Sequence, residues 1–331
     1  MSQLNREIRE AARKLLRENQ VQVVIGFERG SLPLRSRPCF VRKVEDVDRL
    51  TWDGFCEIDL ASYLPKRKEK AAIVAKGCDS RAIMELIKEN QIARDQVFII
   101  GVPCEGMIDR SRIEVETGRE RVVETSPGRT APPIAITGVE ETADSLTLKG
   151  HNFEKVLDRR EFIYARCRTC SHRNPVLYDL LLGQAATEEP QDSFSDVEAL
   201  EALDREERWA YFAAETVKCI RCYACRNACP LCYCPECFVD ASQPQWVGKS
   251  AGLSDTMIFH LTRAFHLAGR CVGCGACENA CPMGVDIGKL NRKLQKDVKV
   301  LFNHEAGVNL DEASPLATFR IDDPEPPMVD P

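Results

Sequence analysis

The chain has 331 residues, of which 44% are hydrophobic and 29% charged, a composition typical of a globular protein with room for two domains. The net charge of −6 argues against a nucleic-acid-binding protein, because such proteins usually present a basic face. Its apolar runs are shorter than the ~20 residues that cross a membrane, and its charged N-terminus does not resemble a secretory signal.

The first elements predicted along the chain are a helix and a strand. Residues 4–18 have the apolar spacing of an amphipathic helix, and residues 21–27 form a short apolar run typical of a buried strand. The proline- and arginine-rich stretch 30–40 is predicted to be a loop.

Residues 71–104 give the clearest fold signal. The apolar runs 71–75 and 97–102 predict two buried strands, and a helix that begins near Asp79 or Ser80 and extends to Asn90 connects them. Strand, helix and strand in this order indicate a right-handed βαβ unit with a parallel sheet. Residues 110–165 are predicted to be strand-rich, with a hairpin over 136–150.

The composition changes at 187–207, where nine acidic residues stand against one arginine. A helix over 204–218 leads into a cysteine-rich region, and a second amphipathic helix is expected over 254–268. The acidic, proline-rich chain after His304 is predicted to be disordered. The residues expected to face inward from the second helix are Met257, Ile258, Leu261, Ala264, Phe265 and Ala268.

These elements predict an α/β N-terminal domain with a parallel-sheet βαβ core and added strands, followed by a mainly α-helical domain. The expected boundaries are 1–186 for the α/β domain, 187–207 for an acidic linker, 208–303 for the helical domain and 304–331 for the tail.

The chain contains 17 cysteines, far above the usual frequency. The sequence features predict a cytoplasmic protein, and the cytoplasm keeps thiols reduced, so clustered cysteines favour metal ligands over disulfides. Two stretches share the pattern Cys-x2-Cys-x2-Cys-x3-Cys-Pro, in which a tight loop supplies three thiolates to one face of a cubane. A pair of zinc sites is the alternative, but zinc does not require this spacing.

The fourth cysteine of each such run ligates the other cluster in two-cluster ferredoxins. We therefore predict two 4Fe–4S clusters with crossed ligands. One is assigned to Cys219, Cys222, Cys225 and Cys281, and the other to Cys229, Cys271, Cys274 and Cys277. Residues 205–300 resemble the helical ferredoxin modules of heterodisulfide reductase and succinate dehydrogenase, which implies a two-cluster electron wire.

The remaining cysteines near the first run have two interpretations. Cys232, Cys234 and Cys237 are either ligands of an additional metal, with Cys39, Cys56 or His260 as a fourth ligand, or buried thiols that pack beside the clusters. The sequence does not decide between them.

A third cysteine set is predicted in the first domain. Cys78 and Cys104 follow the two strands of the βαβ unit, so both are expected at the carboxyl edge of the sheet, where α/β proteins bind ligands. Cys167 and Cys170 form a Cys-x2-Cys loop further on. The four together predict a third 4Fe–4S cluster, and the alternative is buried core thiols beside half a zinc knuckle.

The motifs KGCDSRAI, GVPCEG and CRTC, in this order, resemble the beta subunits of coenzyme F(420)-reducing hydrogenases and dehydrogenases over about residues 15–180. The resemblance implies an iron–sulfur flavoprotein, with FAD next to one 4Fe–4S cluster and electrons pairing there into a hydride. This chain differs from the family pattern in carrying the helical ferredoxin domain at its C-terminal end.

A flavin diphosphate needs neutralising charge, and the N-terminus of the helix after residue 79 offers free N–H groups and a favourable dipole. Nearby basic residues could add charge, although each arginine taken singly is more often an ordinary surface residue. The sequence has no G-x-G-x-x-G motif after a strand. The residues assigned to flavin or phosphate binding are Lys76, Gly77, Asp79, Ser80 and Arg81.

The sequence thus predicts an electron-transfer subunit of a cytoplasmic, anaerobic oxidoreductase complex, inactive alone. It would pass electrons between a hydride carrier, a deazaflavin or a nicotinamide, and a partner such as formate dehydrogenase, a hydrogenase or a heterodisulfide-reductase-like assembly. FAD would convert single-electron traffic into hydride chemistry. The alternative is a flavin-free iron–sulfur adaptor between two redox enzymes. Neither nucleic acid nor a membrane is an expected partner.

Overall fold

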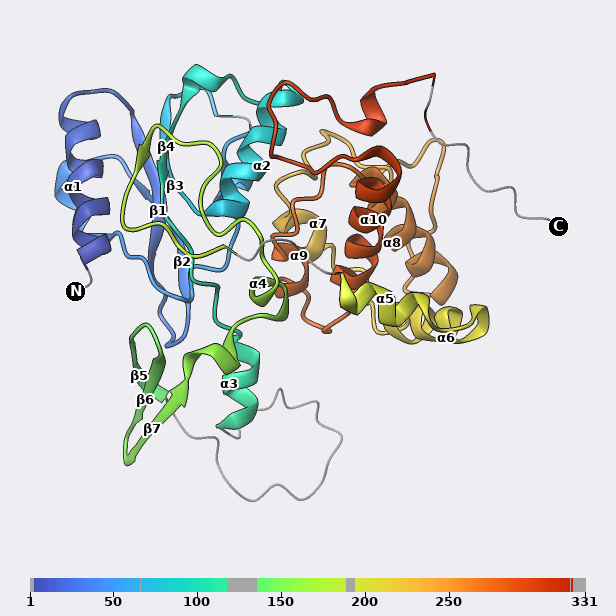
Figure 1. The fold of residues 1–331 in the computed structure, drawn as a ribbon, viewed down its shortest axis with the longest axis horizontal. Coiled ribbons are helices and arrows are strands. Elements are labelled where there is room, and N and C mark those ends of the chain that lie inside the picture. The colour runs from blue at the N-terminus through green and yellow to red at the C-terminus, as the bar shows by residue number, and fades with distance from the viewer. Residues whose placement is uncertain (1–2, 66, 118–135, 189–193, 322, 324–331) are drawn as a thin grey trace.

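The computed structural model describes residues 3–65, 67–117, 136–188, 194–321 and 323. An α/β part on the N-terminal side lies against a helical part formed by the C-terminal half (Figure 1). The predicted fold class is confirmed. In the part of the chain that the structure describes, no helix is long and apolar enough to cross a membrane.

The α/β part is built on a five-stranded sheet in the order β2-β1-β3-β4-β8. The largely buried runs of β1, β3 and β4 pair in parallel, as continuous apolar strands do when both faces are covered. Helix α1 covers one face and α2 the other. The bounds are α1 (Gln3–Arg17), β1 (Val23–Arg29), β2 (Ser36–Val41), β3 (Ala71–Ala75), α2 (Gly77–Lys88), β4 (Val97–Gly101) and β8 (Leu180–Leu181).

The loop predicted over 30–40 is wrong in part, because residues 36–41 form β2. This strand pairs antiparallel with β1 and places Pro38 opposite Phe27. Proline is tolerated there because β2 is the edge strand, so the missing N–H leaves no ladder bond broken inside the sheet.

A small antiparallel sheet extends from the α/β part, in agreement with the predicted hairpin. Its buried leucines and isoleucines form a separate core with α3 and the chain before α4. The bounds are α3 (Arg110–Glu116), β5 (Ile136–Glu141), β6 (Ser145–Gly150), β7 (Phe153–Asp158) and α4 (Ala165–Arg168). Short 3-10 turns occur at η1 (Val44–Arg49), η2 (Leu60–Tyr63), η3 (Arg94–Gln96), η4 (Arg159–Phe162) and η5 (Pro315–Ala317).

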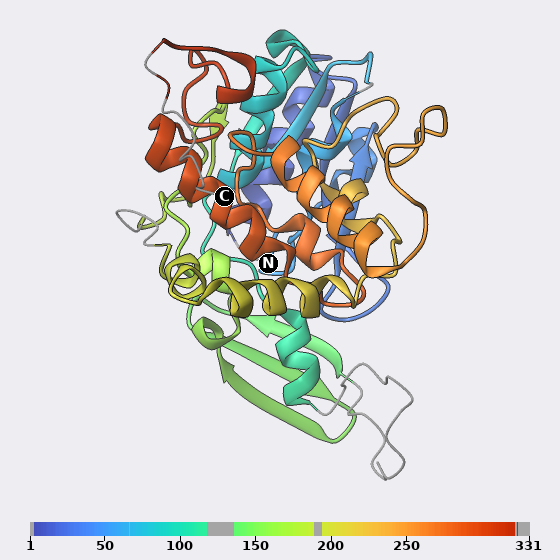
Figure 2. The same cartoon turned by 90° about the vertical axis from the view of Figure 1, so that its right-hand side faces the viewer.

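Six helices form the described C-terminal part (Figure 2). The stretch predicted as a linker contains α5. This helix lies against α10 through ion pairs such as Asp196–Arg292 at 2.7 Å. Residues 189–193 of the predicted linker lie outside the described residues. The bounds are α5 (Ser195–Glu201), α6 (Arg205–Thr216), α7 (Ala224–Ala228), α8 (Leu253–His266), α9 (Ala276–Asn279) and α10 (Ile287–Phe302).

The predicted inward face of α8 is wrong at three positions. Met257 and Ala264 are buried as expected, but the exposed fractions are 47% for Ile258, 36% for Leu261 and 59% for Phe265. The face turned inward instead carries Phe259, His260 and Arg263. Polar side chains thus point toward the cysteine loops, which the apolar spacing alone does not reveal.

The prediction of disorder after His304 is also wrong for the described residues. The C-terminal strap, residues 304–317, returns across the molecule and contacts α2 (Figure 1 and Figure 2). His304 bonds the carbonyl of Gly269 at 2.9 Å, and Arg81 donates to the carbonyl of Ala306 at 2.6 Å. The end of the predicted tail, 324–331, lies outside the described residues.

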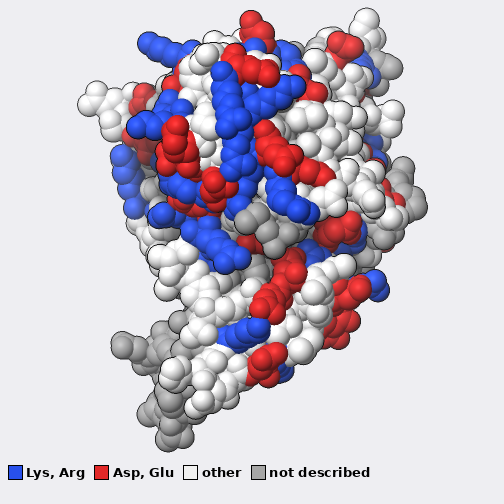
Figure 3. All heavy atoms as spheres, turned by 90° about the vertical axis from the view of Figure 1, so that its left-hand side faces the viewer, with Lys and Arg blue, Asp and Glu red and all other residues white. Residues whose placement is uncertain are grey.

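The face that carries α1 has basic and acidic side chains interspersed over most of its surface (Figure 3). Pairs such as Arg13–Asp48 at 2.6 Å and Arg42–Glu69 at 2.7 Å account for part of this pattern. Such exposed pairs contribute little to stability.

Candidate metal centres

The two cysteine runs of the helical part fold into the same loop. Arg221 and Tyr223 in the first run have φ of 57° and 60°, and Gly273 and Gly275 at the matching positions of the second have 70° and 69°. Left-handed backbone at these two positions gives both loops the same tight turns between their first three cysteines. Glycine adopts it readily, whereas the two non-glycine residues pay a conformational cost.

Cys281, from the second run, lies with the cysteines of the first. Burial raises the pKa of the Cys219 thiol, and the neighbouring Cys281 and Cys222 raise it further. Burial also raises the pKa of Cys225 to about 11, with Cys281 again among the contributing thiols. Backbone N–H groups point at two of the sulfurs: Arg221 N to Cys219 at 3.4 Å and Val285 N to Cys281 at 3.3 Å.

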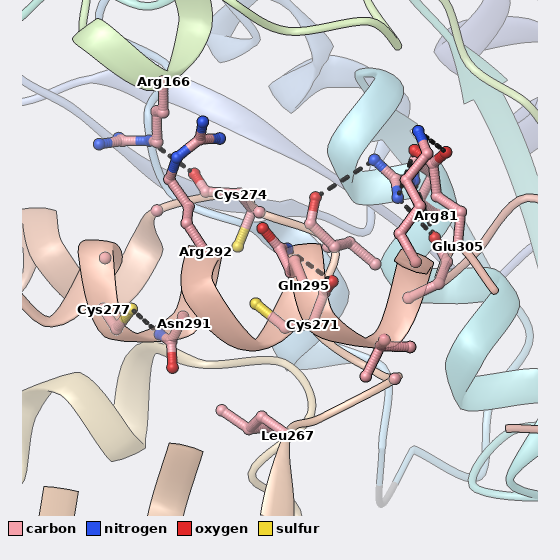
Figure 4. A pocket seen from close by; sticks show the side chains of 18 of the residues that line it. Arg81, Arg166, Leu267, Cys271, Cys274, Cys277, Asn291, Arg292, Gln295 and Glu305 are labelled. Atoms are coloured by element: carbon pink, nitrogen blue, oxygen red, sulfur yellow. Dashed lines mark hydrogen bonds and ion pairs between the residues drawn. The ribbon is translucent and has the colours of Figure 1, made fainter. Parts of the chain in front are cut away.

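Cys229, from the first run, lies with the cysteines of the second. It lines the same pocket as Cys271, Cys274 and Cys277 (Figure 4). Helix α10 forms one wall, where the Asn291 amide contacts the Cys277 sulfur at 3.7 Å and Gln295 donates to the Cys271 carbonyl at 2.8 Å. The structure therefore brings together the two crossed sets, and the ligand assignment itself stays a prediction.

The third predicted set also comes together. Cys78 in the first turn of α2, Cys104 after β4, and Cys167 and Cys170 from the α4 loop all line one pocket. Burial raises the pKa of Cys104 to about 12, with Cys167 the next cause. The Cys104 N–H donates to the Arg173 carbonyl at 3.0 Å and fixes the α4 loop to the sheet edge.

The pockets of the second and third cysteine sets adjoin. Cys170, Cys274, Arg81 and Arg166 line both. Arg166 extends from the α4 loop of the α/β part and donates to the Cys274 carbonyl at 3.1 Å and to Asn279 at 2.8 Å (Figure 4). The wall shared by the two pockets therefore lies at the interface between the α/β and helical parts.

The donor sets suit clusters better than single ions. All 17 cysteines are free thiols. In the described ranges, no group of three or more His, Cys, Asp or Glu side chains could hold one metal ion. A cubane keeps its thiolates further apart than a single ion does, because its irons occupy separate corners. The four thiols of the second set line one pocket and the four thiols of the third set line another, an arrangement that fits that larger group.

The surplus cysteines have different surroundings in the structure. Cys232 bonds the Cys229 thiol, an interaction that lowers the pKa of Cys232, and Cys234 is exposed. Cys39 is buried beside Glu28, and Cys56 beside Asp53 at 3.5 Å. The geometry favours the interpretation of Cys232 as a thiol packed beside a cluster ligand.

The residues predicted to bind a flavin phosphate are engaged within the chain. Lys76 Nζ lies 2.9 Å from Asp79 and donates to the Ile58 carbonyl, while the Ser80 hydroxyl donates to the Gly77 carbonyl and accepts from Val176. A side chain at Gly77 would collide with the His172 carbonyl, so the chain after α4 covers this helix end. Arg81 is buried and bonded to the strap. This geometry does not favour a phosphate site at the N-terminus of α2.

A cleft of about 1050 Å³ lies between the α/β and helical parts. Its walls come from the start of α3, the α4 loop and the chain around α9 and α10. Basic side chains line it, each paired with a carboxylate, as in Arg166–Glu278 at 3.3 Å and Arg110–Glu57 at 3.6 Å. Its volume is in the range of cofactor sites.

Sequence reasoning missed two arginines at these centres. Arg166 connects the second and third cysteine sets, and Arg263 is buried among the thiols of the first and second. Within an amphipathic helix an arginine indicates a polar outer face, so the sequence carries no signal for Arg263. Arg166 precedes Cys167 directly, and that adjacency is the one available signal.

An α/β domain whose cysteines adjoin those of a helical dicluster domain defines an iron–sulfur protein. Residues 218–286 match the 4Fe–4S dicluster domain family. The chain is 26% identical to the beta subunit of the F(420)-dependent formate dehydrogenase of Methanocaldococcus jannaschii, over 89% of either chain. It is also 26% identical to the beta subunit of F(420)-dependent formate dehydrogenase 1 of Methanococcus maripaludis, over 91% of this chain and 90% of that one.

A solved chain of the F(420)-reducing nickel–iron hydrogenase complex from Methanosarcina barkeri aligns with a TM-score of 0.36 and 13% identity, over 50% of this chain and 59% of that chain. The sequence relatives cover both halves of the protein. The resemblance to the coenzyme F(420) hydrogenase/dehydrogenase beta subunit family, joined to a helical 4Fe–4S dicluster domain, is confirmed.

Proposed function

We propose that the protein is an iron–sulfur electron-transfer subunit of an oxidoreductase complex, with three 4Fe–4S clusters in a row. The observation that carries the proposal is the wall shared by the second and third cysteine pockets, together with Arg263, which lines the second pocket and bonds Cys225 of the first set. The order is then the third set, the second set and the first set. Their members are Cys78, Cys104, Cys167 and Cys170; Cys229, Cys271, Cys274 and Cys277; and Cys219, Cys222, Cys225 and Cys281. The second and third sets share lining residues, and Cys225 of the first set lies near Cys277 of the second.

The electron entrance is proposed at the α/β domain, through FAD and a hydride carrier. Support comes from the relatives, whose names describe F(420)-dependent formate dehydrogenases, and from the cleft of about 1050 Å³ beside the α4 loop. When bound, a flavin would exchange a hydride with a deazaflavin or nicotinamide and single electrons with a cluster. In this chain Arg110 and Arg166 line the cleft, each beside a carboxylate with which it would share a bound anionic group.

The partner is proposed to dock near the first cluster. Cys222 is exposed there, and α8 presents Ile258, Leu261 and Phe265 to solvent on the same helical part. The relatives are subunits of formate dehydrogenases, which supports a catalytic subunit of that kind as the partner. A hydrogenase or a heterodisulfide-reductase-like assembly would use the same wire.

A flavin-free adaptor is the second candidate, and one observation favours it. The predicted phosphate site at α2 is filled by contacts of the chain itself, with Lys76 neutralised by Asp79. In that case the clusters alone relay electrons between two enzymes, and no hydride chemistry takes place on this subunit.

A flavin titration followed by an electron-transfer assay distinguishes the two candidates. Anaerobically purified protein is titrated with FAD and then assayed for electron transfer from reduced deazaflavin or nicotinamide to a one-electron dye. We expect FAD to bind, and Cys104→Ala to stop transfer to the dye while FAD stays bound. The matched control is Cys234→Ala, an exposed thiol outside the three sets. Absence of FAD binding, with the partner complex present, would leave the adaptor as the function.

A further inference from the structure

Arg263 is a buried cation on α8 without an obvious structural partner. Its exposed fraction is 3%. One guanidinium nitrogen donates to the carbonyl of Cys225 at 3.1 Å, and the Cys232 thiol lies within reach of the guanidinium, whereas among the described residues Nε and Nη1 are buried without a hydrogen-bond partner. Leaving two donors of a buried charged group unbonded is costly, so they point to a ligand that belongs beside them.

Thiols from two cysteine sets surround Arg263. It lines the pocket that holds Cys229 and Cys277, while its hydrogen bond reaches Cys225 of the other set. An arginine guanidinium stays charged in proteins, and the thiols of Cys277, Cys229, Cys232 and Cys225 are the groups that act most strongly on this one.

The polar neighbours of Arg263 on the same side do not neutralise it. Burial, followed by the charges of Arg263 and Arg221, lowers the pKa of His260 to about 4, so this imidazole is neutral at physiological pH. Arg221 carries a further positive charge and bonds carbonyls of Asp255 and Gly248. The counter-charge must come from the cysteine side.

A 4Fe–4S cluster with four thiolates is a net anion, and an electron added on reduction makes it more negative. Fixed positive charge and N–H donors near the sulfurs therefore favour the reduced form. A cation that lies between two clusters also offsets the repulsion between them when both are reduced.

We propose that Arg263 is the shared counter-ion of the two clusters of the helical part and raises the reduction potential of both. The proposal rests on the proposed two-cluster function of this part. Arg263 acts as a positioning residue, since it tunes the clusters through charge and N–H groups without ligating iron.

The test is a redox titration followed by electron paramagnetic resonance on full-length wild type, Arg263→Gln and Arg263→Lys, with iron counted in each sample. The matched control is Arg205→Gln, which removes an equal charge at an exposed position on α6. We expect both midpoint potentials to fall in Arg263→Gln, to fall less in Arg263→Lys, and to stay unchanged in Arg205→Gln.

Unchanged potentials in Arg263→Gln, or a shift of only one cluster, would overturn the proposal. If Arg263→Gln binds no iron, iron content decides: recovery in Arg263→Lys supports the need for positive charge, and loss in both variants contradicts it. A wild-type protein without cluster signals would instead refute the proposed function, so the two failures are distinguishable.

Discussion

At the scale of single residues, Cys281 gives the sharpest test of the crossed arrangement. It belongs to the second cysteine run, yet its thiol lies close enough to Cys219 of the first run to add to the rise that burial causes in the pKa of Cys219. We expect Cys281→Ser to remove the resonance signal of the cluster held by Cys219, Cys222 and Cys225, although that loop is distant in sequence. The Cys271–Cys277 cluster should keep its signal, and Cys234→Ser should leave both unchanged. Damage confined to the Cys271–Cys277 cluster would show that ligation is not crossed.

A second residue, Glu305, makes the contact of the strap depend on pH. Its hydrogen bond with His172, opposed by burial and assisted by the charge of Arg81, lowers the pKa of the carboxyl to about 2. In an unfolded chain the pKa of a glutamate carboxyl is about 4.3. Because the folded pKa is the lower one, the stabilisation is fully present above about pH 5 and is lost as pH falls toward 2.

We expect Glu305→Gln to lower the unfolding free energy by about 1–2 kcal/mol at neutral pH, allowing for solvent screening of a side chain that is 33% exposed. The difference in unfolding free energy between this variant and wild type should narrow as pH falls from about 5 to about 3. Anaerobic thermal unfolding at each pH measures this difference, and the variant Glu140→Gln, at an exposed position, is the control. A gap that is constant across this range would rule out a titrating Glu305 contact.

At the scale of elements, the C-terminal strap is held by backbone geometry that a side chain would disrupt. Gly307 has φ of 71°, and a Cβ there would lie 2.5 Å from the Arg81 backbone oxygen. Gly284 has a similar φ of 62° but open space around it. We expect Gly284→Ala to cost about 1 kcal/mol for the φ alone, and Gly307→Ala about 2–3 kcal/mol.

The measurement is the unfolding temperature of both variants under identical anaerobic conditions. Equal shifts for the two glycines would mean that the strap is not packed against α2 as described. A larger shift for Gly307→Ala would support the contact, because the cost of the left-handed backbone is common to both variants.

The elements also show which sequence signals sufficed. The βαβ unit was predictable because β3 and β4 are unbroken apolar runs with a helix between them. The strand β2 was not, since its proline and arginines are typical of a loop and only the pairing with β1 makes it a strand. The inward face of α8 was misassigned because Arg263 turns toward thiols, and no periodicity of apolar residues reports that. The strap depends on Gly307 contacting α2, more than 200 positions earlier in the chain.

At the scale of the whole molecule, cysteine spacing predicted which thiols would gather but not how the sets would adjoin. The three sets come from five separate segments of the chain, and their adjacency depends on how the α/β part meets the helical part. Arg166 and the strap fasten that interface, through Cys274 on one side and Arg81 on the other. The proposed wire therefore depends on the assembled chain, because neither half contains all three cysteine sets.

The most direct test of the three-cluster account is the iron and acid-labile sulfide content of anaerobically purified protein. The account predicts about twelve irons per chain in wild type and about eight in Cys78→Ser, because only the third set is removed. The exposed Cys234→Ser should keep the wild-type value. About eight irons in wild type, unchanged by Cys78→Ser, would contradict the third cluster and with it the proposed route through the α/β domain.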